Sequence, residues 1–176
     1  MWVLTMNRKV REIIVDGDIA YVTLTKGYTA IVDSDMVETL QTHNWYALIA
    51  DKGKKVYAAR STDINGKSVM ILMHRVIAKT PEGMHTDHID GCGINNRRSN
   101  LRSATPSQNA QNQGKQTTNT TGVKGVSYIK SRNKWQAAIC FEGNKINIGR
   151  FNTKEEAYHA YCEKAKELHK DFANLG

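Results

Sequence analysis

A polar segment in the second half of the chain sets the strongest limit on how this protein can fold. Residues 110–121 are mainly Gln, Asn, Thr, Gly and Lys, and they include no large apolar side chain. Such a segment cannot bury enough apolar surface to offset the conformational entropy that ordering removes. We therefore expect a flexible tether at 113–121, with separately folded parts on either side of it.

Length and charge narrow the class of protein further. The chain has 176 residues, enough for two small domains with a core each. Its formal net charge of +8 favours a polyanionic partner, which by charge alone includes DNA, RNA and an anionic membrane. No apolar stretch approaches the roughly 20 residues that span a bilayer, and the N-terminus lacks the apolar core of a secretory signal. We expect a soluble, intracellular protein with no membrane partner.

The three cysteines exclude two further classes of small domain. Cys92, Cys140 and Cys162 are odd in number and far apart, and no C-x-x-C pair occurs among them. This spacing favours neither a disulfide framework nor a zinc site with four protein ligands.

Residues 1–70 have the pattern of strands and hairpins. Apolar and polar residues alternate through 19–24, as they do in a half-buried strand. Asn65-Gly66 is the strongest hairpin turn, because both residues tolerate the positive φ of a type I′ turn. A short helix is expected from Asp35 to about Thr42, and a second over 71–80, where apolar residues recur at helical spacing.

A cluster of side chains around Asp87 has the chemistry that phosphodiester hydrolysis needs. Asp87 and His88 place a carboxylate that can bind a metal next to a general base, and neighbouring strand residues face opposite sides. Asn109 is expected to meet Asp87 on one hard cation such as Mg²⁺, which prefers oxygen ligands. Asn100 is expected to fix the imidazole, either next to His88 or by bonding backbone across the loop.

A helix start lies directly behind this cluster. Thr105 can act as the N-cap, Pro106 sits where a missing N–H is harmless, and Gln108 can complete a capping box. Asn109 therefore falls in the first helical turn, where its side chain can point back at the preceding strands.

The residues that carry a family resemblance are Asp87-His88, Asp90-Gly91, Asn95-Asn96-Arg97, Asn100-Leu101-Arg102 and Asn109. Together they resemble an HNH homing endonuclease of the phage and mobile-intron kind. The resemblance implies a ββα-metal fold over about residues 70–112, with His88 as the general base and Asn100 as its partner. It also implies Asp87 and Asn109 as ligands of Mg²⁺ or Mn²⁺, double-stranded DNA as the substrate, and a bacterial or phage-infected cell as the setting.

The same residues also allow simpler interpretations. A lone Asp-His pair is more often structural, and asparagines are common in turns; their joint occurrence at matched spacings favours catalysis. His74 is equally compatible with two roles, a packed and hydrogen-bonded histidine or a contact to phosphate. Arg97, Arg98 and Arg102 flank the motif and are expected to hold phosphates, although one of them can instead pair with Asp90.

Residues 122–176 have the pattern of a small domain with one sheet and one helix. The expected strands are 123–129, 135–141 and 145–151. Thr153 and Glu156 have the spacing of a capping box and begin an amphipathic helix. Residues 118–151 carry six Lys or Arg residues and one Glu, so the sheet is expected to hold the positive field.

The C-terminal part also resembles a known family, through Gly122–Val126, Lys134-Trp135, Ile148–Phe151 and the helix start at Thr153–Tyr161. Over about residues 120–174 it resembles an AP2 DNA-binding domain, which implies that the sheet lies in a DNA major groove. The sequence departs from plant members, since Ala138 and Cys140 offer no strong base contacts, and we expect little fine sequence specificity. The alternative is a basic, solvated sheet with only a packing role. The expected DNA-binding residues here are Lys124, Ser127, Lys130, Arg132, Gln136, Lys145, Asn147 and Arg150.

The sequence thus predicts an α+β protein with four parts. These are a strand-rich region at 1–70, an HNH core at 71–112, a linker at 113–121 and an AP2-like domain at 122–176. The predicted activity is metal-dependent nicking of duplex DNA by a monomer; cutting both strands would take a weak dimer or sequential nicks. No protein partner is expected. Two alternatives are a DNA-binding regulator with a catalytically dead HNH fold and an RNA-binding module.

Overall fold

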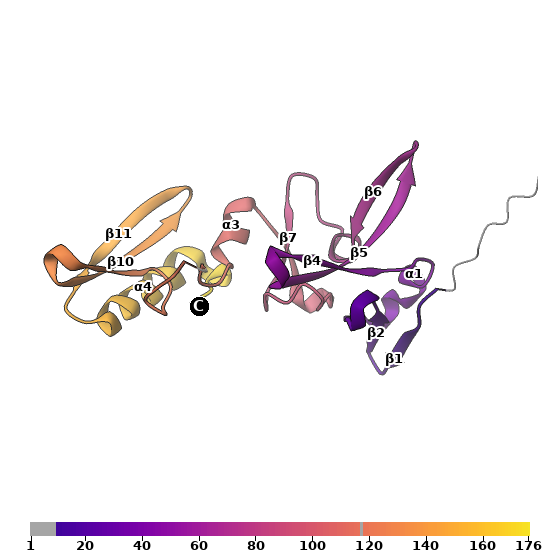
Figure 1. Cartoon of the computed structure of the whole chain (residues 1–176), viewed down its shortest axis with the longest axis horizontal. Helices are drawn as coiled ribbons and strands as arrows, with labels where there is room; N and C mark the ends of the chain where they lie inside the picture. Colours follow the sequence, from indigo (N-terminus) through magenta and orange to yellow (C-terminus); the bar gives the residue numbers. More distant parts are fainter. Residues whose placement is uncertain (1–9, 117) are drawn as a thin grey trace, which may run out of the picture. The chain divides into compact units, whose positions relative to one another are not determined.

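The computed structural model describes residues 10–116 and 118–176 (Figure 1). The first nine residues of the predicted strand-rich region 1–70, and Thr117 of the predicted linker, lie outside the described residues. By its contacts the chain divides into two compact units. The first contains the described residues up to Glu82 together with His88–Ser103, and the second contains Gly83–Asp87 and everything from Ala104 onward. The protein is α+β, as predicted.

Two short strands lie at the division between the units. These are β7 (His85–His88) and β8 (Leu101–Ala104), which form a two-stranded sheet. The polar segment 113–121, by contrast, belongs to the second unit. Within the described residues, no helix has both the length and the apolar character that crossing a membrane requires.

The first unit contains two antiparallel sheets of three strands, in the orders β1-β2-β3 and β4-β5-β6. Its elements are β1 (Ile13–Asp16), β2 (Ile19–Thr23), the 3-10 turn η1 (Thr25–Gly27), β3 (Thr29–Asp33), η2 (Ser34–Met36), α1 (Val37–Leu40), β4 (Tyr46–Ala50), η3 (Asp51–Gly53), β5 (Lys55–Ile64), β6 (Lys67–Leu72), α2 (Met73–Ala78) and η4 (Arg98–Asn100). The predicted hairpin turn is confirmed, because Asn65 and Gly66 join β5 to β6 with φ angles of 52° and 76°.

Both predicted helices of this region are present but shorter than expected. The first is the 3-10 turn η2 followed by α1, which ends at Leu40. The second begins at Met73 and not at residue 71, because Ile71 and Leu72 still pair with Arg60 and Ala59 of β5. Hydrogen bonding in the sheet therefore overrides the helical spacing of these two apolar residues.

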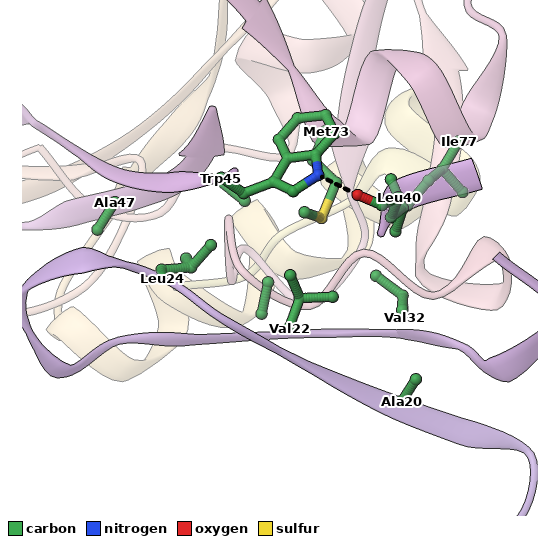
Figure 2. Packing of buried hydrophobic residues seen from close by; sticks show 11 residues of the cluster. Ala20, Val22, Leu24, Val32, Leu40, Trp45, Ala47, Met73 and Ile77 are labelled. Atoms are coloured by element: carbon green, nitrogen blue, oxygen red, sulfur yellow. Dashed lines mark hydrogen bonds between the residues drawn. The ribbon is translucent and has the colours of Figure 1, made fainter. Parts of the chain in front are cut away.

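The core of the first unit forms around Trp45, which is only 2% exposed. Figure 2 shows its indole N–H donating to the backbone oxygen of Leu40, at a distance of 3.1 Å. The hydrogen bond satisfies the polar atom of this buried ring, so the indole can pack against apolar neighbours without an unpaired donor. Met73, at the start of α2, is fully buried in the same cluster. This core fixes α2 and strands β2 to β5 around the residues that flank the candidate site.

The second unit contains one antiparallel sheet in the order β11-β10-β9, and Figure 1 shows α4 along it. Its elements are α3 (Pro106–Gln111), β9 (Val126–Ile129), η5 (Lys130–Arg132), β10 (Lys134–Phe141), β11 (Asn144–Phe151), α4 (Lys154–His169) and η6 (Lys170–Phe172). Ala137 and Ile139 of the middle strand pack against Ala157 and Tyr161 of α4.

Two boundaries in this sheet differ from the prediction. Strand β11 starts at Asn144 and not at residue 145, since Asn144 already pairs with Phe141 and the turn is Glu142-Gly143, with positive φ at both residues. Strand β9 starts at Val126 and not at residue 123, since Gly125 adopts a φ of +73° that ends extended pairing. A Cβ atom at Gly125 would lie 2.0 Å from the ring of Tyr161, so only glycine fits this position.

Candidate active site

Strand β7 presents its side chains to two different environments, as the alternation of a strand requires. His85 and Asp87 face α3 and the residue that follows it. The side-chain amide of Asn112 donates to Asp87 Oδ1 at 3.0 Å, and the amide nitrogen of Asn109 lies 3.4 Å from His85 Nδ1. His88 points to the other side, into the first unit, where it is 6% exposed.

In the first unit, the imidazole of His88 is held by Asn96. Its Nε2 atom lies 3.0 Å from Asn96 Oδ1, and Asn96 is completely buried. The amide nitrogen of Asn96 donates a hydrogen bond to the sulfur of Met73 at 3.6 Å. A thioether sulfur can accept a hydrogen bond but has no proton to donate. This contact points the amide oxygen at His88, so Nε2 is the donor, and in the neutral imidazole Nδ1 is the basic atom. Asn96 therefore selects the tautomer and orientation of His88.

Two aromatic rings complete the surroundings of His88. The ring of His74 meets it edge to face at a centroid distance of 5.0 Å, and the ring of Tyr57 lies 6.1 Å away. Burial, followed by the nearby charges of His88 and Arg75, lowers the pKa of His74 from 6.5 to about 4. His74 is therefore a neutral, packed histidine at pH 7; the interpretation as a packed, hydrogen-bonded histidine holds for the packing but not for a hydrogen bond at Nδ1, which has no partner among the described residues.

Asn100 holds the loop that follows β7 and not the imidazole. Its oxygen accepts from the backbone N–H of Asp90 at 3.0 Å, and its nitrogen donates to the carboxylate of Asp90 and the backbone oxygen of Asn95. Burial acts to raise the pKa of Asp90, but hydrogen bonds from Cys92, Asn95 and Asn100 outweigh it and lower that pKa. Of the two placements predicted for Asn100, the structure has the bond across the loop.

The loop also approaches β5 so closely that it needs a glycine. A Cβ atom added to Gly93 would lie 2.4 Å from the backbone oxygen of Val56 and 2.6 Å from the ring of Tyr57. The same tyrosine contacts His74 and His88. The loop is thus fixed at one end by Asn100 and along its length by contact with β5.

The arginines that follow the loop are engaged with carboxylates. Arg97 donates to Asp18 at 2.9 Å and to Asp33 at 3.2 Å. Arg98 donates to Asp35 at 2.7 Å, and its backbone N–H donates to Asp33. The predicted alternative partner, Asp90, is replaced by these residues of the first unit, because Asp90 is taken up by the loop. Arg102 lies half-buried on β8.

The donor groups near Asp87 suit a hard cation. The capping box at the start of α3 is confirmed, with hydrogen bonds between Thr105 and Gln108 in both directions, and it fixes the position of Asn109. No group of three or more His, Cys, Asp or Glu side chains that could hold a metal occurs among the described residues. Any metal here would therefore depend on the carboxylate of Asp87 with the amide oxygens of Asn109 or Asn112. Such oxygen donors fit Mg²⁺ or Mn²⁺ and do not fit a structural zinc ion.

The sheet of the second unit presents most of its predicted DNA-binding residues on its open face. Ser127, Gln136 and Arg150 occupy one cross-strand row, and Gln136 donates to Asn147 at 3.0 Å. Lys145 lies opposite the exposed Cys140. The predicted Lys130 and Arg132 are exposed in η5, at the end of β9.

Lys124 differs from the prediction. Its Nζ atom donates to the backbone oxygens of Gln111, Gln113 and Asn174, at distances of 2.6 to 3.0 Å. Burial lowers the pKa of this lysine. Its ammonium group therefore ties three segments of the second unit together, and we remove it from the DNA-binding set.

Two residues of the site did not emerge from the sequence. Asn96 belongs to the motif that carries the family resemblance, but nothing in its spacing pointed to the imidazole. Asn112 follows Asn109 by three residues, which is the helical spacing that places both on one face. That spacing was the available indication that a second amide could reach β7.

Comparison with known proteins decides the family. No model of a protein family matches the chain, and no solved structure matches it either. Protein 3.8 of Escherichia phage T7 is 37% identical over 95 residues, covering 54% of this chain and 78% of that protein. An uncharacterized HNH endonuclease of Acanthamoeba polyphaga mimivirus is 32% identical over 160 residues, covering 88% of this chain and 80% of the relative. The chain belongs to the HNH endonuclease family.

The extent of the second match matters for the family assignment. A similarity that covers 88% of the chain must include residues of both units, since neither unit is that large. The relationship therefore extends beyond the short motif around Asp87. The prediction of an HNH nuclease is confirmed at the level of the family.

Proposed function

We propose that the protein is a metal-dependent endonuclease that hydrolyses phosphodiester bonds in double-stranded DNA and nicks one strand per active site. The observation that carries the proposal is the hydrogen bond from His88 Nε2 to Asn96 Oδ1. A general base needs a basic nitrogen in a fixed orientation, and this bond places the proton of the neutral imidazole on Nε2, so that Nδ1 is its basic atom.

His88 is the proposed catalytic base. Its Nδ1 atom takes a proton from the attacking water, and the resulting positive charge is stabilised through the Nε2–H bond to the Asn96 oxygen. His74 supports the same state, because a neutral neighbour adds no positive charge beside His88. Asn96 acts as a positioning residue and does not contact the scissile phosphate.

Asp87, with Asn109 or Asn112, is the proposed holder of a divalent cation. When bound, such a cation supplies Lewis-acid stabilisation of the leaving 3′-oxygen, so that the products carry 5′-phosphate and 3′-hydroxyl ends. The peptide bond between Asp87 and His88 keeps the carboxylate and the base adjacent, whatever else in the chain changes.

The sheet β9-β10-β11 is proposed to position the duplex, in the manner of an AP2 domain. The row formed by Ser127, Gln136 and Arg150 supports this role, because it offers hydroxyl, amide and guanidinium groups on one exposed surface. A three-stranded surface of this kind suits the major groove, where base edges and flanking phosphates can both be reached. Ala138 lies in the centre of the face, so most of the binding is expected to be insensitive to sequence.

A plasmid assay tests the proposal. Supercoiled DNA incubated with the protein and Mg²⁺ or Mn²⁺ is expected to become open circular, and chelation of the metal is expected to stop the reaction. His88→Ala is expected to abolish nicking while duplex binding remains. Nicking by His88→Ala at the wild-type rate would overturn the assignment of the base. Duplex binding by the wild type without nicking under any divalent metal would instead support the alternative, a regulator with an inactive nuclease fold.

A further inference from the structure

A polar hollow on the first unit lies apart from every residue used in the proposed active site. It has a volume of about 730 Å³ and is lined by Arg11, Thr25, His43, Asn44, Tyr46, Arg60 and Ser61. The lining carries two guanidinium groups and no carboxylate, so its formal charge is +2 with neutral histidine.

Trp45 organises both arginines of the hollow. Arg11 donates from Nη1 to the backbone oxygen of Trp45 at 2.8 Å, and its backbone N–H donates to Asn44. The guanidinium of Arg60 stacks over the Trp45 ring, with Cζ 5.7 Å from the ring centroid. Because Trp45 is buried in the core, the guanidinium groups of Arg11 and Arg60 are held in place before any ligand binds. Less side-chain entropy is therefore lost when an anion binds.

These two arginines differ from those beside the active-site loop. Arg97 and Arg98 are neutralised by Asp18, Asp33 and Asp35. Within the described part of the chain, by contrast, no ion pair involves Arg11 or Arg60, whose guanidinium groups contact a carbonyl oxygen and an aromatic ring. Their charge is therefore available to an anion that enters the hollow.

The remaining lining supplies neutral hydrogen-bond donors. The Tyr46 hydroxyl lies 3.4 Å from the hydroxyl of Ser61, and either group can turn its proton toward a ligand. His43 uses Nδ1 in a contact of 2.7 Å with Thr42, which leaves its Nε2 for other partners. Arginine forks combined with hydroxyl donors are the set that phosphate oxygens prefer.

We propose that this hollow is a second phosphate-binding site, which holds the sugar–phosphate backbone of duplex DNA away from the phosphodiester that is cut. Size favours a polymer over a single anion, because a water molecule takes about 30 Å³ and the hollow is many times larger. The inference rests on the proposed function for its choice of DNA. It assigns backbone positioning in the first unit to Arg11 and Arg60 in place of the neutralised Arg97 and Arg98.

Duplex binding by full-length protein tests the site. In a His88→Ala background, which keeps the DNA intact, Arg60→Gln and Arg11→Gln are compared with Lys55→Gln. Lys55 is exposed on the same strand as Arg60, and its variant loses the same charge outside the hollow. Each arginine variant is expected to weaken binding about tenfold more than the lysine variant, and to reduce the salt slope by about 0.9 per lost phosphate contact.

Ser61→Glu guards against a folding artefact. Ser61 is exposed, so the new carboxylate should leave the melting temperature unchanged while repelling DNA from the hollow. Equal affinities and salt slopes for Ser61→Glu, Arg60→Gln and Lys55→Gln would overturn the inference, provided that the wild type nicks plasmid. An absence of both binding and nicking in the wild type would count against the proposed function itself.

A second arm separates DNA from free anions. Inorganic phosphate at millimolar concentration is expected to leave the melting temperature of the wild type nearly unchanged. Stabilisation by phosphate that Ser61→Glu removes, together with unaltered duplex binding in the same variant, would identify a small-anion site and contradict the DNA assignment.

Discussion

The two faces of strand β7 differ in the groups that surround them. On the face of His88 the neighbours are an aromatic ring, a neutral histidine and a fully buried amide whose oxygen is turned toward the imidazole. On the face of Asp87 the neighbours are the amides of Asn109 and Asn112, at the end of a capped helix. One face holds a single tautomer of a base, and the other places two side-chain amides beside His85 and Asp87. Neighbouring residues can thus be prepared for separate tasks because a strand turns them apart.

The largest expected effect comes from removing either of the two β7 residues. His88→Ala and Asp87→Ala should each slow nicking by about 10²–10⁴-fold, the range typical of a lost general base. Raising the divalent metal concentration should restore part of the activity of Asp87→Ala, because that variant binds the cation weakly. No such recovery is expected for His88→Ala. The nicking rate of each variant, measured as a function of metal concentration, tests this difference. Equal recovery in both variants would contradict the assignment of separate roles to Asp87 and His88.

The next effect concerns stability and belongs to the His88 face alone. The folded protein keeps His74 neutral down to about pH 4, whereas the unfolded chain takes up a proton near pH 6.5. The contribution of His74 is therefore complete above pH 6.5 and is lost as the pH falls toward 4. By linkage the loss is on the order of 3 kcal/mol.

Denaturant unfolding of the wild type and of His74→Phe at pH 7 and pH 4 measures this contribution. The phenylalanine ring does not titrate, so the variant should lose less stability on acidification than the wild type. Parallel losses in the two proteins would mean that His74 is protonated as easily in the fold as in the unfolded chain.

On the Asp87 face, the two asparagines can be ranked against each other. Loss of a metal ligand or of its close support typically costs 10–100-fold in metal affinity or activity. Asn112→Ala should raise the metal concentration needed for half-maximal nicking within that range, because Asn112 is the amide that contacts Asp87. Asn109→Ala tests the ligand predicted from the sequence. Normal nicking and normal metal dependence in Asn109→Ala would leave Asn112 as the ligand.

The smallest expected effect is that of the residue that orients the base. Asn96→Ala leaves the Nε2–H of His88 without its acceptor, and the rate constant for nicking should fall about tenfold with little change in KM. Met73→Leu keeps the volume of the side chain but removes the sulfur that orients the Asn96 amide, so a smaller fall in the same rate constant is expected for it. A change in KM alone for Asn96→Ala would point to a role in DNA binding and not in orientation.

Much of the local structure could be predicted from the sequence, because short-range rules determine it. The Asn65-Gly66 turn and the two capping boxes depend on residues a few positions apart, and all three are present. The alternation that buries Ala137 and Ile139 beside α4 is equally local. Boundaries were less predictable: Ile71 and Leu72 have helical spacing but are held in the sheet by β5.

The partners of the site depended on contacts between distant parts of the chain. Asp33 and Asp18 form ion pairs with Arg97 although they lie more than sixty residues from it in the sequence. Met73, which orients Asn96, lies 23 residues from it in the sequence. Lys124 had the charge of a DNA contact but is enclosed by three carbonyl oxygens. No periodicity or motif spacing carries such information, because only the folded chain brings these groups together.

The division of the chain into two units has a practical consequence for anyone who wishes to exchange them. Because the backbone leaves the first unit after Glu82, re-enters it at His88 and leaves again after Ser103, no single cut separates the two. A chimera joined at the polar segment would carry the whole of β7 and β8 with its N-terminal parent. Grafting the second unit intact would require three junctions, one of which falls between the proposed base and the proposed cation holder. A chimera that keeps the proposed site must therefore take Asp87 and His88 from the same parent protein.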